Sequence, residues 1–143
     1  LNDLLTTTYD PAFIDYNQPT LLSIPSKISK KFAVKSGTTA TDSWTIGYNP
    51  DLITSIWVGY DEGLDIDVSS SVQAKTAWAY AMENYLKDSK ENWYKKPSNV
   101  VGVLVDPISG KPVKNNSTKK RILYYLKGTE PTNHQMVFDD ISQ

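Results

Sequence analysis

The chain has 143 residues, of which 39% are hydrophobic and 22% are charged, and this size and composition predict about one globular domain with a modest core. Its formal net charge of −1 gives no electrostatic basis for binding nucleic acid or an anionic membrane. Because the sequence has no cysteine, a disulfide scaffold, a thiol nucleophile and a thiolate metal site are excluded.

The first residues have the pattern of a helix interior rather than of a chain start. Leu1, Leu4 and Leu5 have helical spacing, and no residue that would cap a helix precedes them. We therefore expect residues 1–8 to end a helix and the chain to be a piece of a longer protein. For this reason, the lack of a signal peptide and of an apolar run of about 18–20 residues says little about the whole protein.

Residues 9–29 predict an irregular connection, because prolines and turn residues recur along them. The apolar side chains of this connection are too many for a free linker, so parts of it should pack on the domain. They are Tyr9, Phe13, Ile14, Tyr16, Leu21 and Leu22.

Three strand-like runs follow at residues 30–36, 43–48 and 53–60, and they predict an antiparallel meander. An Asn-Pro-Asp turn at residues 49–51 joins the second run to the third. Apolar residues lie on both faces of these strands, so we expect cover on both sides of the sheet.

An acidic loop at residues 61–67 comes next. Its carboxylates lack the glycine and the final glutamate of an EF-hand at the required spacing, so the loop is predicted to be solvated rather than to bind calcium. A helix is then predicted at residues 71–87, with Ser70 opening a capping box. Trp78 and Tyr85 have the helical spacing of its apolar positions, and both are expected in the core.

Two further strands are predicted at residues 100–105 and 121–126. Together the elements indicate an α/β chain of the α+β kind, in which an antiparallel sheet of about five strands is covered by the helix at residues 71–87. The ordered part is expected to span residues 1–131, with a flexible tail at residues 132–143.

No complete catalytic set occurs in the sequence. The only histidine, His134, lies in the expected tail, which argues against a Ser-His-Asp triad. No phosphate-binding loop and no metal-ligand spacing stands out, so neither a metal nor an organic cofactor is expected.

The remaining candidate for a site is the run Lys35-Ser36-Gly37-Thr38-Thr39, at the end of the first predicted strand. Side chains alternate across a strand, so the hydroxyls of Ser36 and Thr38 share one face and can converge on one ligand group. A Lys-Ser-Gly triplet alone is a weak signal, because it often occurs by chance where a strand leads into a loop.

The sequence around the triplet resembles the transpeptidase domain of class A penicillin-binding proteins. That domain has a Lys-Thr-Gly-Thr-Thr strand, then an Asp-x-Trp-Phe-x-Gly-Tyr-x-Pro-Asp-Leu strand and a Trp-Val-Gly-Tyr-Asp strand. Similar runs occur here in the same order at residues 35–39, 42–52 and 57–61, and segments 106–110 and 127–131 resemble its closing parts. The resemblance covers nearly the whole chain before the expected tail.

The resemblance implies a serine D,D-transpeptidase that cross-links peptidoglycan stem peptides through an acyl-enzyme and binds β-lactams. In such an enzyme, Lys35 would place positive charge beside the substrate carboxylate, and the hydroxyls of Ser36 and Thr38 would bind that group. Gly37 would let the substrate lie along the strand, and Thr39 would make at most a minor contact. The Thr38 N–H would supply half of the oxyanion hole. Lys35 and Thr38 are thus the expected catalytic residues, and residues 36–39 the expected substrate-binding residues.

The family's nucleophile belongs to a Ser-x-x-Lys motif that a Ser-x-Asn motif follows, and no convincing copy of either occurs here. The resemblance implies that the remainder of the same polypeptide carries both, beside an upstream glycosyltransferase domain and an anchor on the outer face of the bacterial plasma membrane. The isolated chain is then expected to be inactive. The sheet face that the missing part covers is expected to be exposed or occupied by a partner copy.

Three departures from the family pattern bear on the site. Ser36 replaces the usual threonine, which keeps the hydroxyl but leaves its rotamer less fixed. Thr45 stands where phenylalanine is usual, and residues 9–25 replace a glycine-rich stretch.

Two other functions are compatible with the sequence. The first is a non-catalytic extracellular module that binds the cell wall through exposed tryptophan and tyrosine side chains. The second is a β-lactamase, which the Tyr-Asn-Pro-Asp-Leu and Gly-Thr-Glu-Pro runs disfavour.

Overall fold

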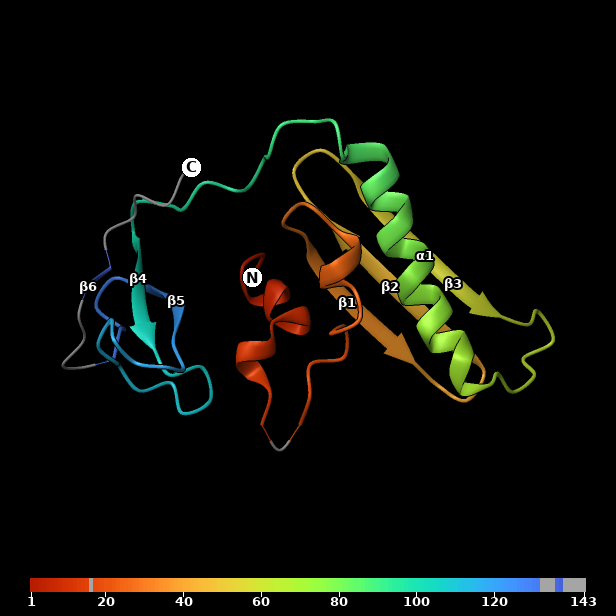
Figure 1. Ribbon diagram of the computed structural model, residues 1–143, viewed down its shortest axis with the longest axis horizontal. Coiled ribbons are helices and arrows are strands. Elements are labelled where there is room, and N and C mark those ends of the chain that lie inside the picture. The colour runs from red at the N-terminus through yellow and green to blue at the C-terminus, as the bar shows by residue number, and fades with distance from the viewer. Residues whose placement is uncertain (16, 132–135, 138–143) are drawn as a thin grey trace. The chain divides into compact units, whose positions relative to one another are not determined.

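The computed structural model describes residues 1–15, 17–131 and 136–137. The chain divides into two compact units, each described by itself below (Figure 1). The first unit contains Leu1–Asp10 and Gln18–Tyr94, and the second contains Pro11–Asn17 and Lys95–Gln143. His134 and most of the predicted tail lie outside the described residues, so the tail at residues 132–143 stays a prediction.

The sheet of the first unit is the predicted meander. Strands β1 (Ala33–Thr38), β2 (Asp42–Tyr48) and β3 (Ile53–Gly59) pair antiparallel in the order β1-β2-β3 (Figure 1). The Asn49 side chain closes the second turn, because its carbonyl accepts hydrogen bonds from the backbone N–H groups of two following residues. In this order β1 lies at an edge of the sheet.

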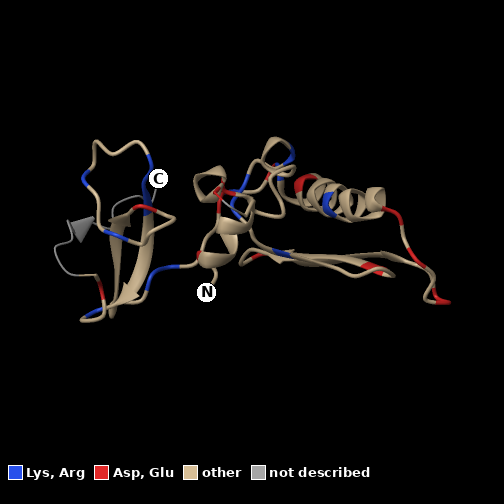
Figure 2. Ribbon diagram, turned by 90° about the horizontal axis from the view of Figure 1, so that it is seen from below, with Lys and Arg blue, Asp and Glu red and all other residues tan. Residues whose placement is uncertain are grey.

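Helix α1 (Val68–Leu86) lies along one face of this sheet (Figure 2). It begins three residues before the predicted start because Asp67, not Ser70, is its cap. The Asp67 carboxylate accepts a hydrogen bond from the Ser70 N–H at 3.0 Å. Hydrogen bonds from the Ser69 hydroxyl and then from the Ser70 N–H lower the pKa of Asp67 below its usual value of 3.8. The Asp67 carboxylate is therefore ionised at neutral pH and stabilises the helix start. This stabilisation is lost as the pH falls through the lowered pKa.

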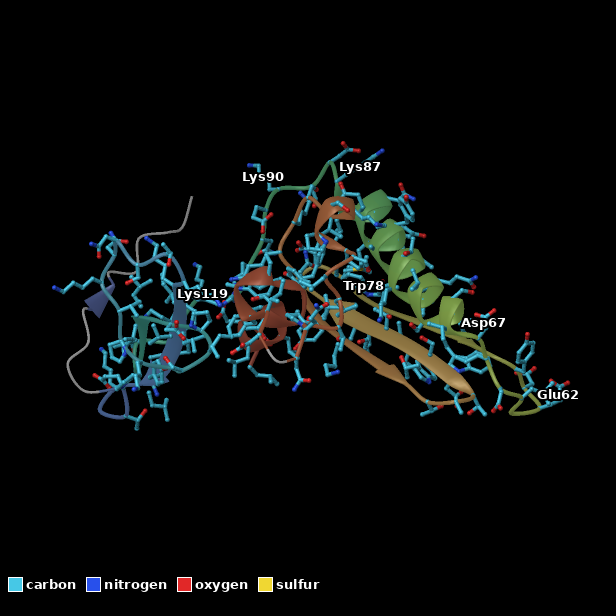
Figure 3. The ribbon with its side chains drawn as sticks, turned by 60° about the horizontal axis from the view of Figure 1, so that its bottom comes forward. Glu62, Asp67, Trp78, Lys87, Lys90 and Lys119 are labelled. Atoms are coloured by element: carbon cyan, nitrogen blue, oxygen red, sulfur yellow. The ribbon has the colours of Figure 1, made fainter. Side chains whose placement is uncertain are left out.

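Trp78 is the centre of the core between α1 and the sheet (Figure 3). It is fully buried, its ring meets Phe32 edge-on with centroids 5.5 Å apart, and its indole N–H donates to the Thr54 carbonyl. The prediction for Trp78 is confirmed, whereas that for Tyr85 is wrong, because this side chain is 79% exposed. Ala79 and Leu86 of the helix face the core. Apolar side chains from the segment before β1 pack against the same core. The buried cluster comprises Leu21, Ile24, Phe32, Val34, Trp78, Ala79, Met82 and Leu86.

Two glycines of the sheet differ sharply in the space around them. A Cβ added to Gly47 would lie 2.3 Å from Cζ2 of Trp78, whereas a Cβ on Gly37 would meet nothing within 4 Å. We expect Gly47→Ala to lower the free energy of unfolding by about 1–3 kcal/mol, since overpacking forces the indole to move. Gly37→Ala should change it by less than about 1 kcal/mol. Urea unfolding followed by circular dichroism measures both, and equal effects would contradict this packing.

The other face of the first sheet is open. The burial of β2 alternates residue by residue, and the side chains on the face away from α1 are exposed. Trp44 is 48% exposed and Trp57 39%, with their ring centroids 6.3 Å apart. We expected both faces of the sheet to be covered, but within the described residues only the face under α1 is covered. Lys35 belongs to the open face.

The segment before β1 differs from the predicted helix end. Residues Leu4–Tyr9 form the 3₁₀ helix η1, and Pro11–Phe13 and Pro25–Lys27 form the shorter turns η2 and η3. In η1, the hydroxyl groups of three consecutive threonines donate to the carbonyls three residues earlier. Such local bonds compete with the spacing of an α-helix.

The second unit has a sheet of its own, which corrects the prediction of one sheet of about five strands. Strands β4 (Val100–Val105), β5 (Arg121–Leu126) and β6 (Met136–Val137) pair antiparallel in the order β5-β4-β6. The alternation of side chains identified β4 and β5 as strands but gave no information on their partners. Across both units, no described helix is long and apolar enough to cross a membrane.

Candidate functional site

The predicted motif lies on β1, at the free edge of the first sheet. The Thr39 N–H donates to the Asp42 carbonyl at 2.8 Å and closes the hairpin to β2. The Val34 carbonyl, in contrast, accepts a hydrogen bond from the Thr8 hydroxyl, which lies outside the sheet. In an antiparallel pair, alternate residues turn their backbone groups towards and away from the neighbouring strand. Ser36 and Thr38 therefore direct their N–H and carbonyl groups to the free edge.

The Lys35 ammonium is held at the same edge. The side chain starts from the open face, is exposed, and donates from Nζ to the Ser36 carbonyl at 2.6 Å. That carbonyl points away from β2, so the contact brings the positive charge around to the edge. The cation and the outward backbone groups of Ser36 and Thr38 thus lie together.

Ser36 and Thr38 share the face that α1 covers, as the alternation predicted. Ser36 is 8% exposed, whereas Thr38 is exposed. The Ser36 hydroxyl is 2.9 Å from the hydroxyl of Thr20, a contact across 16 positions that the sequence did not reveal. A ligand that takes the Ser36 proton leaves Thr20 only the role of donor in this contact.

The last two residues of the motif have different surroundings. The open space beside Gly37 leaves room for a ligand backbone along β1. The Thr39 hydroxyl accepts from the Asp42 N–H at 3.0 Å and bonds to the Asp42 carboxylate, so it serves the hairpin. The Thr41 hydroxyl, then the Trp57 indole N–H, lower the pKa of Asp42. Asp42 is therefore a charged part of the hairpin next to the motif.

A second lysine faces this edge from α1. The helix runs antiparallel to β1, since the Glu83 carboxylate accepts from the Ser29 N–H before the strand begins (Figure 1). Lys75 lies about 12 Å before Glu83 along the helix, in the direction in which β1 runs towards the motif. Its pKa is lowered by partial burial and then by the Lys35 ammonium. The repulsion between these two cations would be relieved by an anionic ligand.

The described residues provide binding groups rather than a nucleophile with its base. The Ser36 hydroxyl bonds to another hydroxyl, and the Lys35 ammonium bonds to a carbonyl. No cluster of three or more histidine, aspartate or glutamate side chains that could hold a metal ion occurs among them. The arrangement can hold a carboxylate and an extended peptide and can donate an N–H to a polarised oxygen.

Comparisons with known proteins find similarity to penicillin-binding proteins. A family model described as the C-terminal domain of penicillin-binding protein 1A matches residues 96–140. The chain is 40% identical over 131 residues to penicillin-binding protein 2D of Bacillus subtilis, which covers 91% of this chain and 19% of that protein. It is 28% identical to penicillin-binding protein 1A of Escherichia coli, over 68% of this chain and 13% of that protein.

A solved structure gives the same result for the fold. The crystal structure of penicillin-binding protein 1A from Haemophilus influenzae matches 92% of this chain and 20% of its own, with a TM-score of 0.71 and 27% identity. The chain therefore spans 13–20% of the length of these relatives.

Proposed function

The chain belongs to the class A penicillin-binding proteins, and we propose that it forms part of a peptidoglycan D,D-transpeptidase that cross-links stem peptides and binds β-lactams. In this proposal a serine of the same polypeptide, in a Ser-x-x-Lys motif outside this chain, forms the acyl-enzyme. The chain contributes the Lys35-Ser36-Gly37-Thr38 strand. The observation that carries the proposal is the free edge of β1, where the Lys35 ammonium binds the outward Ser36 carbonyl and the strand pairing directs the Thr38 N–H outwards.

The edge suits an extended peptide with a terminal carboxylate. A peptide can pair with the outward backbone groups of Ser36 and Thr38, as in other complexes in which a strand is added to a sheet. Gly37 leaves space for it. The Lys35 ammonium and the two hydroxyls then bind the carboxylate, which accepts up to four hydrogen bonds.

The Thr38 N–H has the second role, which is to stabilise the transition state. Attack of the serine on the carbonyl carbon moves negative charge onto the carbonyl oxygen, and a fixed donor stabilises that charge most strongly where water is excluded. A rigid edge strand fixes such a donor, because its direction is set by the pairing with β2. Thr39, whose hydroxyl serves the hairpin, has no direct role in this scheme.

Replacement of Lys35 tests the carboxylate site. In the longer protein, Lys35→Gln should lower the rate constant of acylation by a fluorescent penicillin about 10–100-fold, because a hydrogen bond to a charged group contributes roughly 1.5–3 kcal/mol. Lys87→Gln is the matched control, since Lys87 is exposed at the far end of α1 (Figure 3). Equal rate constants for the Lys35 variant and the unchanged protein would rule out this role of Lys35.

The open face of the first sheet supports a second candidate function. Trp44 and Trp57 form an exposed aromatic pair of the kind that binds sugars or another protein surface. A non-catalytic module that binds the cell wall would sediment with insoluble peptidoglycan and lose this binding on Trp44→Ala. A transpeptidase part in which this face is covered by the rest of the polypeptide would not depend on Trp44 in this way.

We also propose where the whole protein acts. Peptidoglycan lies outside the bacterial plasma membrane, so the transpeptidase is placed on the outer face, with its anchor and a glycosyltransferase domain in the remainder of the polypeptide.

A further inference from the structure

Thr45, on β2, has a buried hydroxyl that the proposed function leaves unexplained. The side chain is fully buried, and its Oγ1 has no hydrogen-bond partner among the described residues. Most buried polar groups are hydrogen-bonded, since an unpaired one keeps the full cost of leaving water. A buried hydroxyl of this kind therefore calls for a hydrogen-bond partner that this arrangement of side chains does not provide.

Ser36 is the neighbour that can provide this partner. Ser36 and Thr45 lie directly opposite each other in the pairing of β1 with β2. The Ser36 carbonyl points to the free edge, so the two form a pair without mutual backbone hydrogen bonds, in which side chains approach most closely. Both side chains lie on the face under α1. Directly opposite Cβ atoms lie about 4.5–5.5 Å apart, so we expect a rotation about χ1 to bring the two hydroxyls within hydrogen-bond reach.

The number of protons on these groups sets the direction of each bond. An ionised carboxylate only accepts, so Ser36 must give its single proton to a carboxylate ligand. Its oxygen then has free lone pairs in a buried place. Thr45 has one proton, and its Oγ1 has no hydrogen-bond partner as it is placed among the described residues. With the ligand bound, Thr45 donates to Ser36 and Ser36 donates to the carboxylate, so the protons of both hydroxyls have acceptors.

We propose that Thr45 is a positioning residue that turns the Ser36 hydroxyl towards the ligand carboxylate, and that, when no ligand is bound, Ser36 donates its proton to Thr20 instead. The inference rests on the proposed function and adds to it a residue and a competing contact. Without ligand, the Ser36 hydroxyl pairs with Thr20 at 2.9 Å and leaves Thr45 unpaired. Serine, which lacks the methyl group that restricts threonine, can change between these partners.

The test uses the longer protein and a fluorescent penicillin that carries a carboxylate. Thr45→Val should lower the acylation rate constant about five- to tenfold, the effect of one hydrogen bond. Its melting temperature should stay the same or rise, because an unpaired buried hydroxyl is removed. Thr45→Ser keeps the hydroxyl and should stay within about twofold of the unchanged protein. Thr20→Val removes the competing hydroxyl and should raise the rate constant.

Two controls separate positioning from a structural role. Thr54 lies on the same face of the sheet but is paired with Gly47 rather than with Thr45. Thr54→Val should therefore leave the rate constant unchanged. In a Ser36→Ala background, Thr45→Val should have no further effect, since Thr45 acts through Ser36. A fall in both melting temperature and rate constant, or an equal effect of Thr45→Val in both backgrounds, would overturn the inference. If the unchanged protein is acylated and Thr45→Val matches it, this inference alone fails. If the unchanged protein is not acylated, the proposed function fails first.

Discussion

Replacing Thr38 by proline should lower the rate constant of acylation by penicillin about 10²–10³-fold, the usual loss when one oxyanion donor is removed. Proline lacks the N–H, and because its ring fixes φ at about −65°, circular dichroism checks that the variant is folded. Proline is tolerated at edge strands where the N–H points away from the sheet. Because the Thr38 N–H points to the free edge, the pairing of β1 with β2 loses no hydrogen bond.

Two neighbouring substitutions serve as controls for this result. Thr38→Val keeps the N–H and removes only the hydroxyl, so its rate constant should fall much less than that of Thr38→Pro. Thr39→Pro removes an N–H that donates to Asp42 and should destabilise the hairpin. If Thr38→Pro and Thr38→Val had equal rate constants in folded protein, the Thr38 N–H would have no part in the reaction.

Replacing Trp78 by alanine should lower the free energy of unfolding by about 3–5 kcal/mol, which is the range for large aromatic side chains removed from a core. The loss has four sources. The indole is fully buried, it packs edge-on against Phe32, and it fills the space that Gly47 leaves open. Its N–H also donates to the Thr54 carbonyl, which then loses a partner.

Tyr85 provides the matched control on the same helix. It is also a large aromatic residue of α1 but is 79% exposed, so Tyr85→Ala should change the free energy of unfolding by less than about 0.5 kcal/mol. Urea unfolding followed by far-UV circular dichroism reports the loss of α1 in both variants. Similar values for the two variants would show that Trp78 is not the centre of the core.

The first sheet could be predicted from the sequence because its signals are local. Alternating side chains and the Asn-Pro-Asp turn identify the three strands, and their short connections make neighbours pair. The later strands could be found in the same way, but their partners could not. The pairing of β4 with β5 rather than with the first sheet depends on contacts that alternation does not encode. The helix start was misplaced by three residues because Asp67 and Ser70 are both good caps.

From the sequence, only the site residues that lie on β1 could be predicted. Lys35, Ser36 and Thr38 follow from a motif and from the two-residue period of a strand. Thr20 and Lys75 approach the motif from distant parts of the chain, and no local pattern marks them. Thr45 was noticed only as a departure from the family pattern. Its position opposite Ser36 became visible once the register of β1 and β2 was known.

The central claim is that this chain supplies one wall of a penicillin-binding site whose nucleophile lies elsewhere in the same polypeptide. Covalent labelling by a fluorescent penicillin, applied to the longer protein and to the 143-residue chain, tests it most directly. The account predicts that the longer protein is labelled and that the chain is not. Labelling of the chain alone would place the nucleophile within it, and a folded longer protein that is not labelled would contradict the transpeptidase proposal and favour a cell-wall-binding module.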